Sequence, residues 1–186
     1  MRGAGDKYMQ EVLIQRLPSK GFNEHSLDDF VRHQVVSECW RNVGGEWKLL
    51  PIAFTEDWGP DKCREVAADI FQRAGRDLIS FAAFQNDKVI GFITVNTRPM
   101  GSGKQYLQLE SFHVSEPCRG QGIGKELFAK ACAAAKETGA QKLYISAHSS
   151  KESQAAYSAL GCVHALEIIP CIADEEPYDV QMEYVL

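Results

Sequence analysis

The sequence lacks several features that would place the protein in a specialised class. No apolar run approaches the ~20 residues that a membrane-spanning helix needs, so no membrane partner is expected. Residues 1–10 contain no apolar segment of the kind found in secretory signals. The net charge is −5, whereas nucleic-acid-binding proteins present a basic surface. These absences argue against a membrane protein, a secreted protein and a nucleic-acid-binding protein.

Cysteine is present, but in no pattern that indicates a disulfide framework or a metal site. Six cysteines form no C-x-x-C pair and stand at no metal-ligand spacing from a histidine: Cys39, Cys63, Cys118, Cys132, Cys162 and Cys171. Disulfides persist in oxidising compartments and are rare in the cytosol. We therefore expect reduced thiols, no bound metal and a cytoplasmic location.

Helical and strand-like patterns alternate along the chain. Apolar residues at helical spacing predict helices over 26–39, 61–74, 123–138 and 149–160. Ser26 is the expected N-cap of the first helix, and Ser149 with Glu152 forms an expected capping box for the last. Apolar runs bounded by turns predict strands over 12–14, 47–54, 78–84, 89–95, 107–114, 143–147, 163–169 and 180–186. A chain of 186 residues without a linker or repeat is expected to form one domain, residues 1–186, with an α/β fold and a mixed sheet.

The most distinctive segment is Arg119-Gly120-Gln121-Gly122-Ile123-Gly124-Lys125, called the glycine turn below. Alternate glycines leave backbone N–H groups free to converge on an anion. The helix that follows contributes unpaired N–H donors and the positive end of its dipole. A strand before the turn and a helix after it therefore predict a phosphate-binding site.

Two common phosphate-binding motifs fit this chain poorly. A P-loop requires G-x-x-x-x-G-K-[ST], but Arg98 and Gln105 break that pattern around Gly103-Lys104. A dinucleotide-binding fingerprint requires G-x-G-x-x-G in a βαβ unit. The glycine turn has G-x-G-x-G instead, and the strands before it are expected to pair as an antiparallel meander.

The remaining pattern is R-x-x-G-x-G between a strand and a helix, carried by Arg119, Gly122 and Gly124. A second signature follows about 30 residues later as Ser150-x-x-Ser153-x-x-x-Tyr157-x-x-Leu160-Gly161. In this order the two signatures resemble the GNAT superfamily of acetyl-CoA-dependent N-acetyltransferases. The resemblance implies a mostly antiparallel central sheet of about six or seven strands, flanked by helices and splayed at the acetyl-CoA site. It covers residues 78–186 as the acetyl-CoA-binding half and leaves 1–77 as a variable acceptor-side half.

The resemblance also implies which residues hold the cosubstrate. Backbone N–H groups of the glycine turn would bind the pyrophosphate of coenzyme A, and the strand before it would pair with the pantetheine arm. Ser150 stands where family members often have asparagine. The expected acetyl-CoA-binding residues are Phe112, His113, Val114, Arg119, Gly120, Gln121, Gly122, Ile123, Gly124, Lys125 and Ser150.

Amine acetylation requires removal of a proton from the amine and protonation of the departing thiolate. Glu110 is our candidate general base, directly or through water, because it lies on the cofactor-binding strand. A strand period of two places it on the same face as Val114, four residues later. Tyr157 matches the family's usual general acid. His148 is a weaker candidate for the base, and Cys118 is not needed for this mechanism.

The acceptor is least defined by the sequence. Glu56-Asp57-Trp58 and Asp174-Glu175-Glu176 place acidic clusters in predicted loops, where they would suit a small cationic primary amine. A protein lysine or N-terminal amine remains an alternative acceptor, and a non-catalytic acyl-CoA-binding protein is an alternative function. The use of other acyl groups and the formation of a homodimer are left open.

Overall fold

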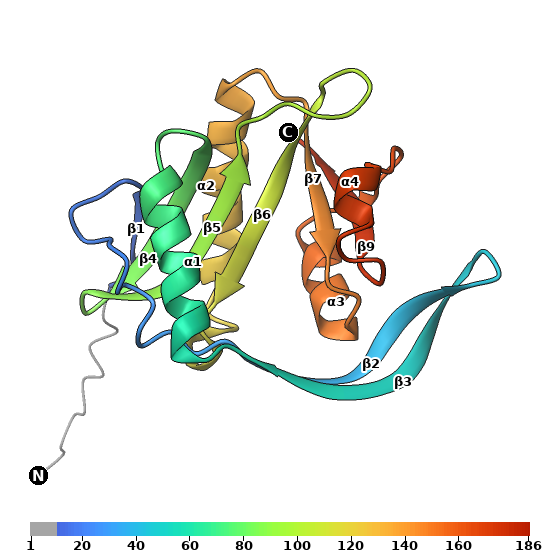
Figure 1. Cartoon of the computed structure of the whole chain (residues 1–186), viewed down its shortest axis with the longest axis horizontal. Helices are drawn as coiled ribbons and strands as arrows, with labels where there is room; N and C mark the ends of the chain where they lie inside the picture. The colour runs from blue at the N-terminus through green and yellow to red at the C-terminus, as the bar shows by residue number, and fades with distance from the viewer. Residues whose placement is uncertain (1–10) are drawn as a thin grey trace, which may run out of the picture.

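A computed structural model describes residues 11–186, and the prediction that residues 1–10 carry no secretory signal lies outside that range. In the described residues, seven strands form one sheet in the order β1-β4-β5-β6-β7-β9-β8 (Figure 1). Strands β6 and β7 run parallel, and the other neighbouring pairs described run antiparallel. The predicted mixed, mostly antiparallel sheet is therefore confirmed. The sheet strands are β1 Leu13–Arg16, β4 Leu78–Gln85, β5 Lys88–Asn96, β6 Tyr106–Val114, β7 Lys142–Ala147, β8 Val163–His164 and β9 Val180–Val185.

Helices cover both faces of the sheet. Helix α1 lies on one face and α2 on the other, so the sheet has an apolar core on each side (Figure 1). The central strands β4 and β5 are almost continuously buried, as expected for strands covered on both faces. The helical segments are α1 Pro60–Arg73, the 3₁₀ turn η1 Glu116–Cys118, α2 Ile123–Glu137, α3 Lys151–Ala159 and α4 Pro170–Ala173.

Strands β6 and β7 separate part-way along their length. Their parallel pairing runs from Tyr106↔Lys142 to Leu109↔Ile145 and includes no later residue of β6. Pairing between β5 and β6 also shifts register, because Thr94 pairs with Ser111 while Val95 pairs with Leu109. This leaves Glu110 as the extra residue of a β-bulge. The sheet thus opens between β6 and β7, as the family resemblance implied.

A long hairpin extends from the body of the protein and curves past α3 (Figure 1). Its strands are β2 His33–Val43 and β3 Glu46–Asp57, joined through Gly44 and Gly45, both with positive φ. The hairpin contacts the start of α3 through a bridge between Cys39 and Ser150. It therefore brings the end of β3 near the open side of the sheet.

The helix predicted over 26–39 is wrong, since residues 33–43 form β2 and Ser26 caps no helix. The apolar residues at helical spacing ended with Val35 and Cys39, but Val35 is exposed and Val36 is buried in its place. A register shift between Val36 and Glu38 puts Val36 and Cys39 on the same buried side of the strand although they are three residues apart. Pairing with β3, which local periodicity cannot reveal, decides the structure.

Two smaller predictions also need correction. The N-cap of α3 is Ser150 rather than Ser149, because the Ser150 hydroxyl accepts a hydrogen bond from the Ser153 N–H. The strand predicted over 163–169 is only two residues long. After His164 the chain bends at residues 166–167, and α4 begins at Pro170.

Candidate active site

A cavity of about 1060 Å³ lies where β6 and β7 separate. Its walls come from β6, β7, the start of α2, helix α3 and the hairpin strands β2 and β3. Most of the residues predicted from the sequence to bind acetyl-CoA or to act in catalysis line it: Glu110, Phe112, His113, Val114, Arg119, Gly120, Gly122, Ile123, Gly124, Lys125 and Tyr157. Gln121 and Ser150 are not part of the lining among the described residues.

The glycine turn lies at one end of the cavity and leads into α2. Gly120 and Gly122 have φ values of 75° and 84°, which favour glycine, and a Cβ at either position would meet no atom within 4 Å. Gly124 is different, because a Cβ there would lie 3.3 Å from the Phe112 ring. The first two glycines thus leave open space over the turn, and the third allows close packing of α2 on β6.

The start of α2 presents unpaired donors to this open space. Gly122 is its N-cap and provides no side-chain hydrogen bond to the helix. The first hydrogen bond within the helix runs from the Glu126 N–H to the Gly122 carbonyl. The N–H groups of residues 123–125 therefore have no acceptor within the helix. Donors of this kind suit a phosphate group. The turn therefore fits the pyrophosphate of coenzyme A.

The edge of β6 beyond Leu109 is free on the side of β7. Residues 111–114 stay paired with β5 on their other side. An extended ligand could pair with this free edge as an added strand would. At the end of β6, the Nε of Arg119 donates to the Val114 carbonyl at 3.1 Å. The Arg119 side chain therefore lies against the last residue of the strand, beside the glycine turn.

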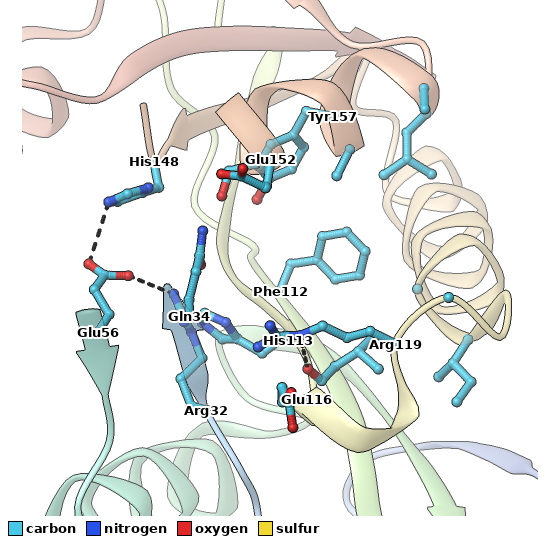
Figure 2. Close-up of a pocket in the computed structure, with 18 of the residues that line it drawn as sticks. Arg32, Gln34, Glu56, Phe112, His113, Glu116, Arg119, His148, Glu152 and Tyr157 are labelled. Carbon is cyan, nitrogen blue, oxygen red and sulfur yellow. Dashed lines mark hydrogen bonds and ion pairs between the residues drawn. The ribbon is translucent and has the colours of Figure 1, made fainter. Parts of the chain in front are cut away.

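Tyr157 extends from α3 into the cavity, on the same helix as Glu152 (Figure 2). Its ring lies 6.2 Å from the ring of Phe112 on β6. Burial, with smaller contributions from Cys162 and Asp179, raises the pKa of the phenol. Tyr157 therefore keeps its proton at neutral pH, so the phenol is protonated when a neighbouring group needs a donor.

Glu110 lines the cavity but is held by other side chains. Arg73 of α1 binds both carboxylate oxygens, at 2.9 and 3.1 Å, and the Asn96 amide donates to Oε1 at 2.5 Å. The prediction that Glu110 shares a face with Val114 is wrong. The bulge shifts the alternation of β6, so Glu110 meets α1 while Val114 packs in the core that α2 covers.

His113 belongs to an aromatic cluster. Its ring lies 4.7 Å from the ring of Trp58 and 5.4 Å from that of Phe92. Burial, assisted by Arg32 and Arg119, lowers the pKa of His113 to about 3. The imidazole is therefore neutral, and Trp58, which we expected beside the acceptor, is instead packed on this cluster.

The far side of the cavity carries a linked set of charges. Glu56, at the end of β3, binds Arg32 Nη2 at 2.9 Å and His148 Nε2 at 3.4 Å (Figure 2). The Ser150 N–H donates to His148 Nδ1, so the neutral ring carries its proton on Nε2 and directs it to Glu56. His148 thus has no free lone pair for use as a base, and burial lowers its pKa.

Ser150 occupies a structural position. It is completely buried, caps α3, and its hydroxyl accepts a hydrogen bond from the Gln34 amide at 2.9 Å. The predicted contact between Ser150 and pantetheine remains a prediction. Gln121 lies on the outer part of the glycine turn, where its amide donates to the Pro117 carbonyl at 3.5 Å.

Of the two predicted acidic clusters, one residue from each lines the cavity: Glu56 and Glu176. Glu56 lies at the end of a strand rather than in a loop. Two further cavity residues, Arg32 and Asp179, were missed by the sequence analysis. Arg32 was hidden by the incorrect helix prediction. The only local signal for Asp179 is the turn Glu176-Pro177-Tyr178-Asp179, closed by an N–H to carbonyl bond of 2.9 Å.

The family of the chain follows from these features and from comparison with known proteins. A central sheet that opens beside a glycine turn and a helix start suits an extended, phosphate-bearing ligand. The family model described as Acetyltransferase (GNAT) family matches residues 46–162, and the chain belongs to this family. It is therefore an acyltransferase that uses acetyl-CoA. No curated protein matches significantly.

Solved structures share the fold across most of the chain. Nourseothricin acetyltransferase is 17% identical, with 94% of this chain and 98% of that chain covered and a TM-score of 0.68. A protein from Bacillus anthracis str. Ames, provisionally described as a streptothricin acetyltransferase and solved with acetyl coenzyme A, is 17% identical, with 95% and 97% covered and a TM-score of 0.66. An aminoglycoside 6'-N-acetyltransferase with coenzyme A is 16% identical, with 67% and 80% covered and a TM-score of 0.51.

Residues 11–186 show neither a membrane-spanning helix nor a metal-binding group of side chains. No helix in that part of the chain is long and apolar enough to cross a membrane. No group of three or more histidine, cysteine, aspartate or glutamate side chains there is arranged to hold a metal ion. All six cysteines are free thiols, and Cys118, beside the glycine turn, is partly buried.

Proposed function

We propose that the protein transfers the acetyl group of acetyl-CoA to a small cationic primary amine by direct attack of the amine on the thioester. The observation that carries this proposal is the continuity of the cavity. It joins the glycine turn, the free edge of β6, Tyr157 and a wall of carboxylates. A thioester bound along β6 would therefore meet an amine held on the opposite wall.

The glycine turn and β6 would position acetyl-CoA. N–H groups at the start of α2 would hold the pyrophosphate, and the backbone of Phe112, His113 and Val114 would pair with the pantetheine arm. A backbone N–H of this strand would polarise the acetyl carbonyl. The open space above Gly120 and Gly122 supports this placement, since a side chain at either position would occupy it.

Tyr157 would act as the general acid. When the carbon–sulfur bond breaks, its phenol gives a proton to the departing thiolate. Its raised pKa keeps the phenol protonated at neutral pH, so the proton is present when the sulfur departs. Glu110 would act as a general base through a water at Oε2, which accepts only the Arg73 Nη1 bond among the described residues, whereas Oε1 accepts from both Arg73 and Asn96.

The acceptor proposal follows from charge. Glu56 and Glu176 line the same cavity as Phe112, and carboxylates attract an ammonium group. The names of two solved relatives, nourseothricin acetyltransferase and aminoglycoside 6'-N-acetyltransferase, add support for small-molecule acceptors in proteins with this fold.

The test is acetylation of a panel of acceptors with acetyl-CoA at pH 7.5. The panel contains cadaverine, L-lysine, aniline and a lysine-containing peptide blocked at its N-terminus. Released coenzyme A is measured by chromatography, because the chain's own six thiols would react with thiol reagents. Acetylation of cadaverine in preference to the peptide supports the proposal, and a preference for the peptide would redirect it to protein lysine.

A further inference from the structure

Three carboxylates that line the cavity lie near enough for Glu56 and Glu176 to act on the charge of the third: Glu56, Glu176 and Asp179. Glu56 has both oxygens engaged, one by Arg32 and one by His148. Within residues 11–186, the Glu176 carboxylate makes no hydrogen bond or ion pair, and the Asp179 carboxylate accepts only a long bond of 3.5 Å from the Ser146 hydroxyl. Asp179 and Glu176 are therefore the carboxylates with oxygens available to a ligand.

Asp179 is also close to the expected centre of the reaction. Its charge contributes to the raised pKa of Tyr157, the proposed proton donor to the coenzyme A sulfur. The turn that joins Glu176 to Asp179 places both carboxylates on the same side of the cavity. An amine bound between them would lie beside the carbon–sulfur bond that Tyr157 serves.

A second observation indicates that a ligand completes this wall. The Arg32 side chain lines the cavity and is only 10% exposed, yet its Nη1 has no hydrogen-bond partner among the described residues. A buried donor without an acceptor is costly, so a ligand oxygen is expected near it.

We infer that Asp179 and Glu176 bind the ammonium group of the acceptor, and that Asp179 takes its first proton before attack. This inference rests on the proposed acetyltransferase function. The ammonium gives one proton to Asp179, and the neutral amine nitrogen forms a bond to the acetyl carbon. The carbon–sulfur bond then breaks, the thiolate takes the Tyr157 proton, and the second nitrogen proton leaves through the water relay of Glu110. Protons then return to Tyr157 and leave Asp179 and Glu110 through solvent, so one proton is released per acetyl group transferred.

The charges around Asp179 suit this role. Burial and the neighbouring Glu176 raise its pKa to about 6, with a further contribution from Glu56. The Ser146 hydroxyl and the Arg41 guanidinium on β2 act in the opposite direction. A carboxylate with a pKa near working pH is an effective proton acceptor and is still ionised at pH 7.5.

The experiment compares Asp179→Asn and Glu176→Gln with controls from the same loop, Asp174→Asn and Glu175→Gln, which do not line the cavity. With cadaverine at pH 7.5, kcat/KM should fall about 100-fold in Asp179→Asn and about tenfold in Glu176→Gln. The KM for acetyl-CoA should stay within about twofold of wild type, and both controls should match wild type. Aniline, which is neutral at this pH, should lose much less activity in Asp179→Asn than cadaverine does.

The pH profile separates this role from simple loss of structure. In wild type and in Glu110→Gln, kcat/KM should fall as the pH drops through about 6, which is the acidic limb of the profile. This fall should be absent from Asp179→Asn. Retention of this limb and of cadaverine turnover in Asp179→Asn would overturn the inference. Equal losses with aniline and cadaverine would overturn it as well.

Binding gives a readout that does not depend on turnover. Calorimetry of cadaverine with the coenzyme A complex should give a signal in wild type and the two control variants that is lost in Asp179→Asn and Glu176→Gln. If wild type binds cadaverine in this way but acetylates no amine, the proposed function fails while the ammonium site stands. If wild type neither binds nor acetylates cadaverine, the ammonium site is refuted.

Discussion

Arg73 of α1 holds both carboxylate oxygens of Glu110 on β6, with Nη1–Oε2 at 2.9 Å and Nη2–Oε1 at 3.1 Å. A two-point contact of this kind fixes the orientation of the carboxylate. It also joins α1 to the strand at the bulge beside the cavity, where β6 and β7 separate. The ion pair thus connects the bulge to α1. The Arg73 side chain is 27% exposed and the Glu110 side chain is 22% exposed.

Loss of this contact should destabilise the protein. Arg73→Gln leaves the Glu110 carboxylate partly buried without its cation, so the free energy of unfolding should fall by about 2 kcal/mol. Arg76→Gln is the control, because Arg76 is exposed and lies outside the ion pair. Urea denaturation measures both variants. Equal stability of Arg73→Gln and Arg76→Gln would show that the contact contributes little.

Gly122 and Gly139 provide a matched test of the glycine turn. They flank α2 with φ values of 84° and 89°, and a Cβ at either position would meet no atom within 4 Å. Alanine at either site should therefore cost about 1 kcal/mol of stability through backbone strain. Only Gly122→Ala should also weaken coenzyme A binding, by about tenfold, because its methyl group would enter the proposed pyrophosphate site. Calorimetric titration with coenzyme A separates the two effects, and equal affinities would refute the assignment.

The proposed general acid predicts a specific kinetic change. Tyr157→Phe should lower kcat about 100-fold while the KM for acetyl-CoA changes by less than about threefold. Tyr184→Phe, which removes a phenol hydroxyl elsewhere in the core, should keep wild-type kinetics. Because the pKa of Tyr157 is raised above its ordinary value, its ionisation should cause no loss of activity up to pH 10. Wild-type kcat in Tyr157→Phe would remove the general-acid role.

Asp179 predicts a dependence of stability on pH. Its pKa rises from 3.8 to about 6 on folding, so the folded state holds this proton more tightly than the unfolded state. Ionisation of Asp179 therefore lowers the free energy of unfolding as pH rises from about 4 to about 6. The full decrease is present above about pH 6. Asp179→Asn should raise the free energy of unfolding at pH 8 by about 1 kcal/mol, after allowance for solvent screening, and change it little at pH 4. Urea denaturation at the two pH values, with Asp174→Asn as control, measures this; the same change at both would contradict it.

The glycine turn and the elements around it could be predicted from the sequence because their signals are local. Glycines with positive φ, a helix start and apolar runs of strand length mark residues 78–147 correctly. The same local information failed at two bulges. One lies between Val36 and Glu38, in a strand that was predicted to be a helix, and the other moves Glu110 to the face opposite Val114.

The acceptor side of the cavity could not be predicted because it is assembled from distant segments. Arg32, Glu56, His148 and Asp179 come from separate segments of the chain, and each interacts with a residue far away in sequence. Their contacts depend on how the β2–β3 hairpin curves past α3 (Figure 1). Such pairing is decided by tertiary structure rather than by local pattern.

The most direct test of the account is a mass balance for acetyl transfer. The protein is incubated with acetyl-CoA and cadaverine, and chromatography with mass spectrometry measures coenzyme A and N-acetylcadaverine together. The account predicts the two products in equal amounts in wild type and about 100-fold slower formation in Tyr157→Phe. Tight binding of acetyl-CoA without acetylation of cadaverine, or of any other amine in the panel, would contradict it.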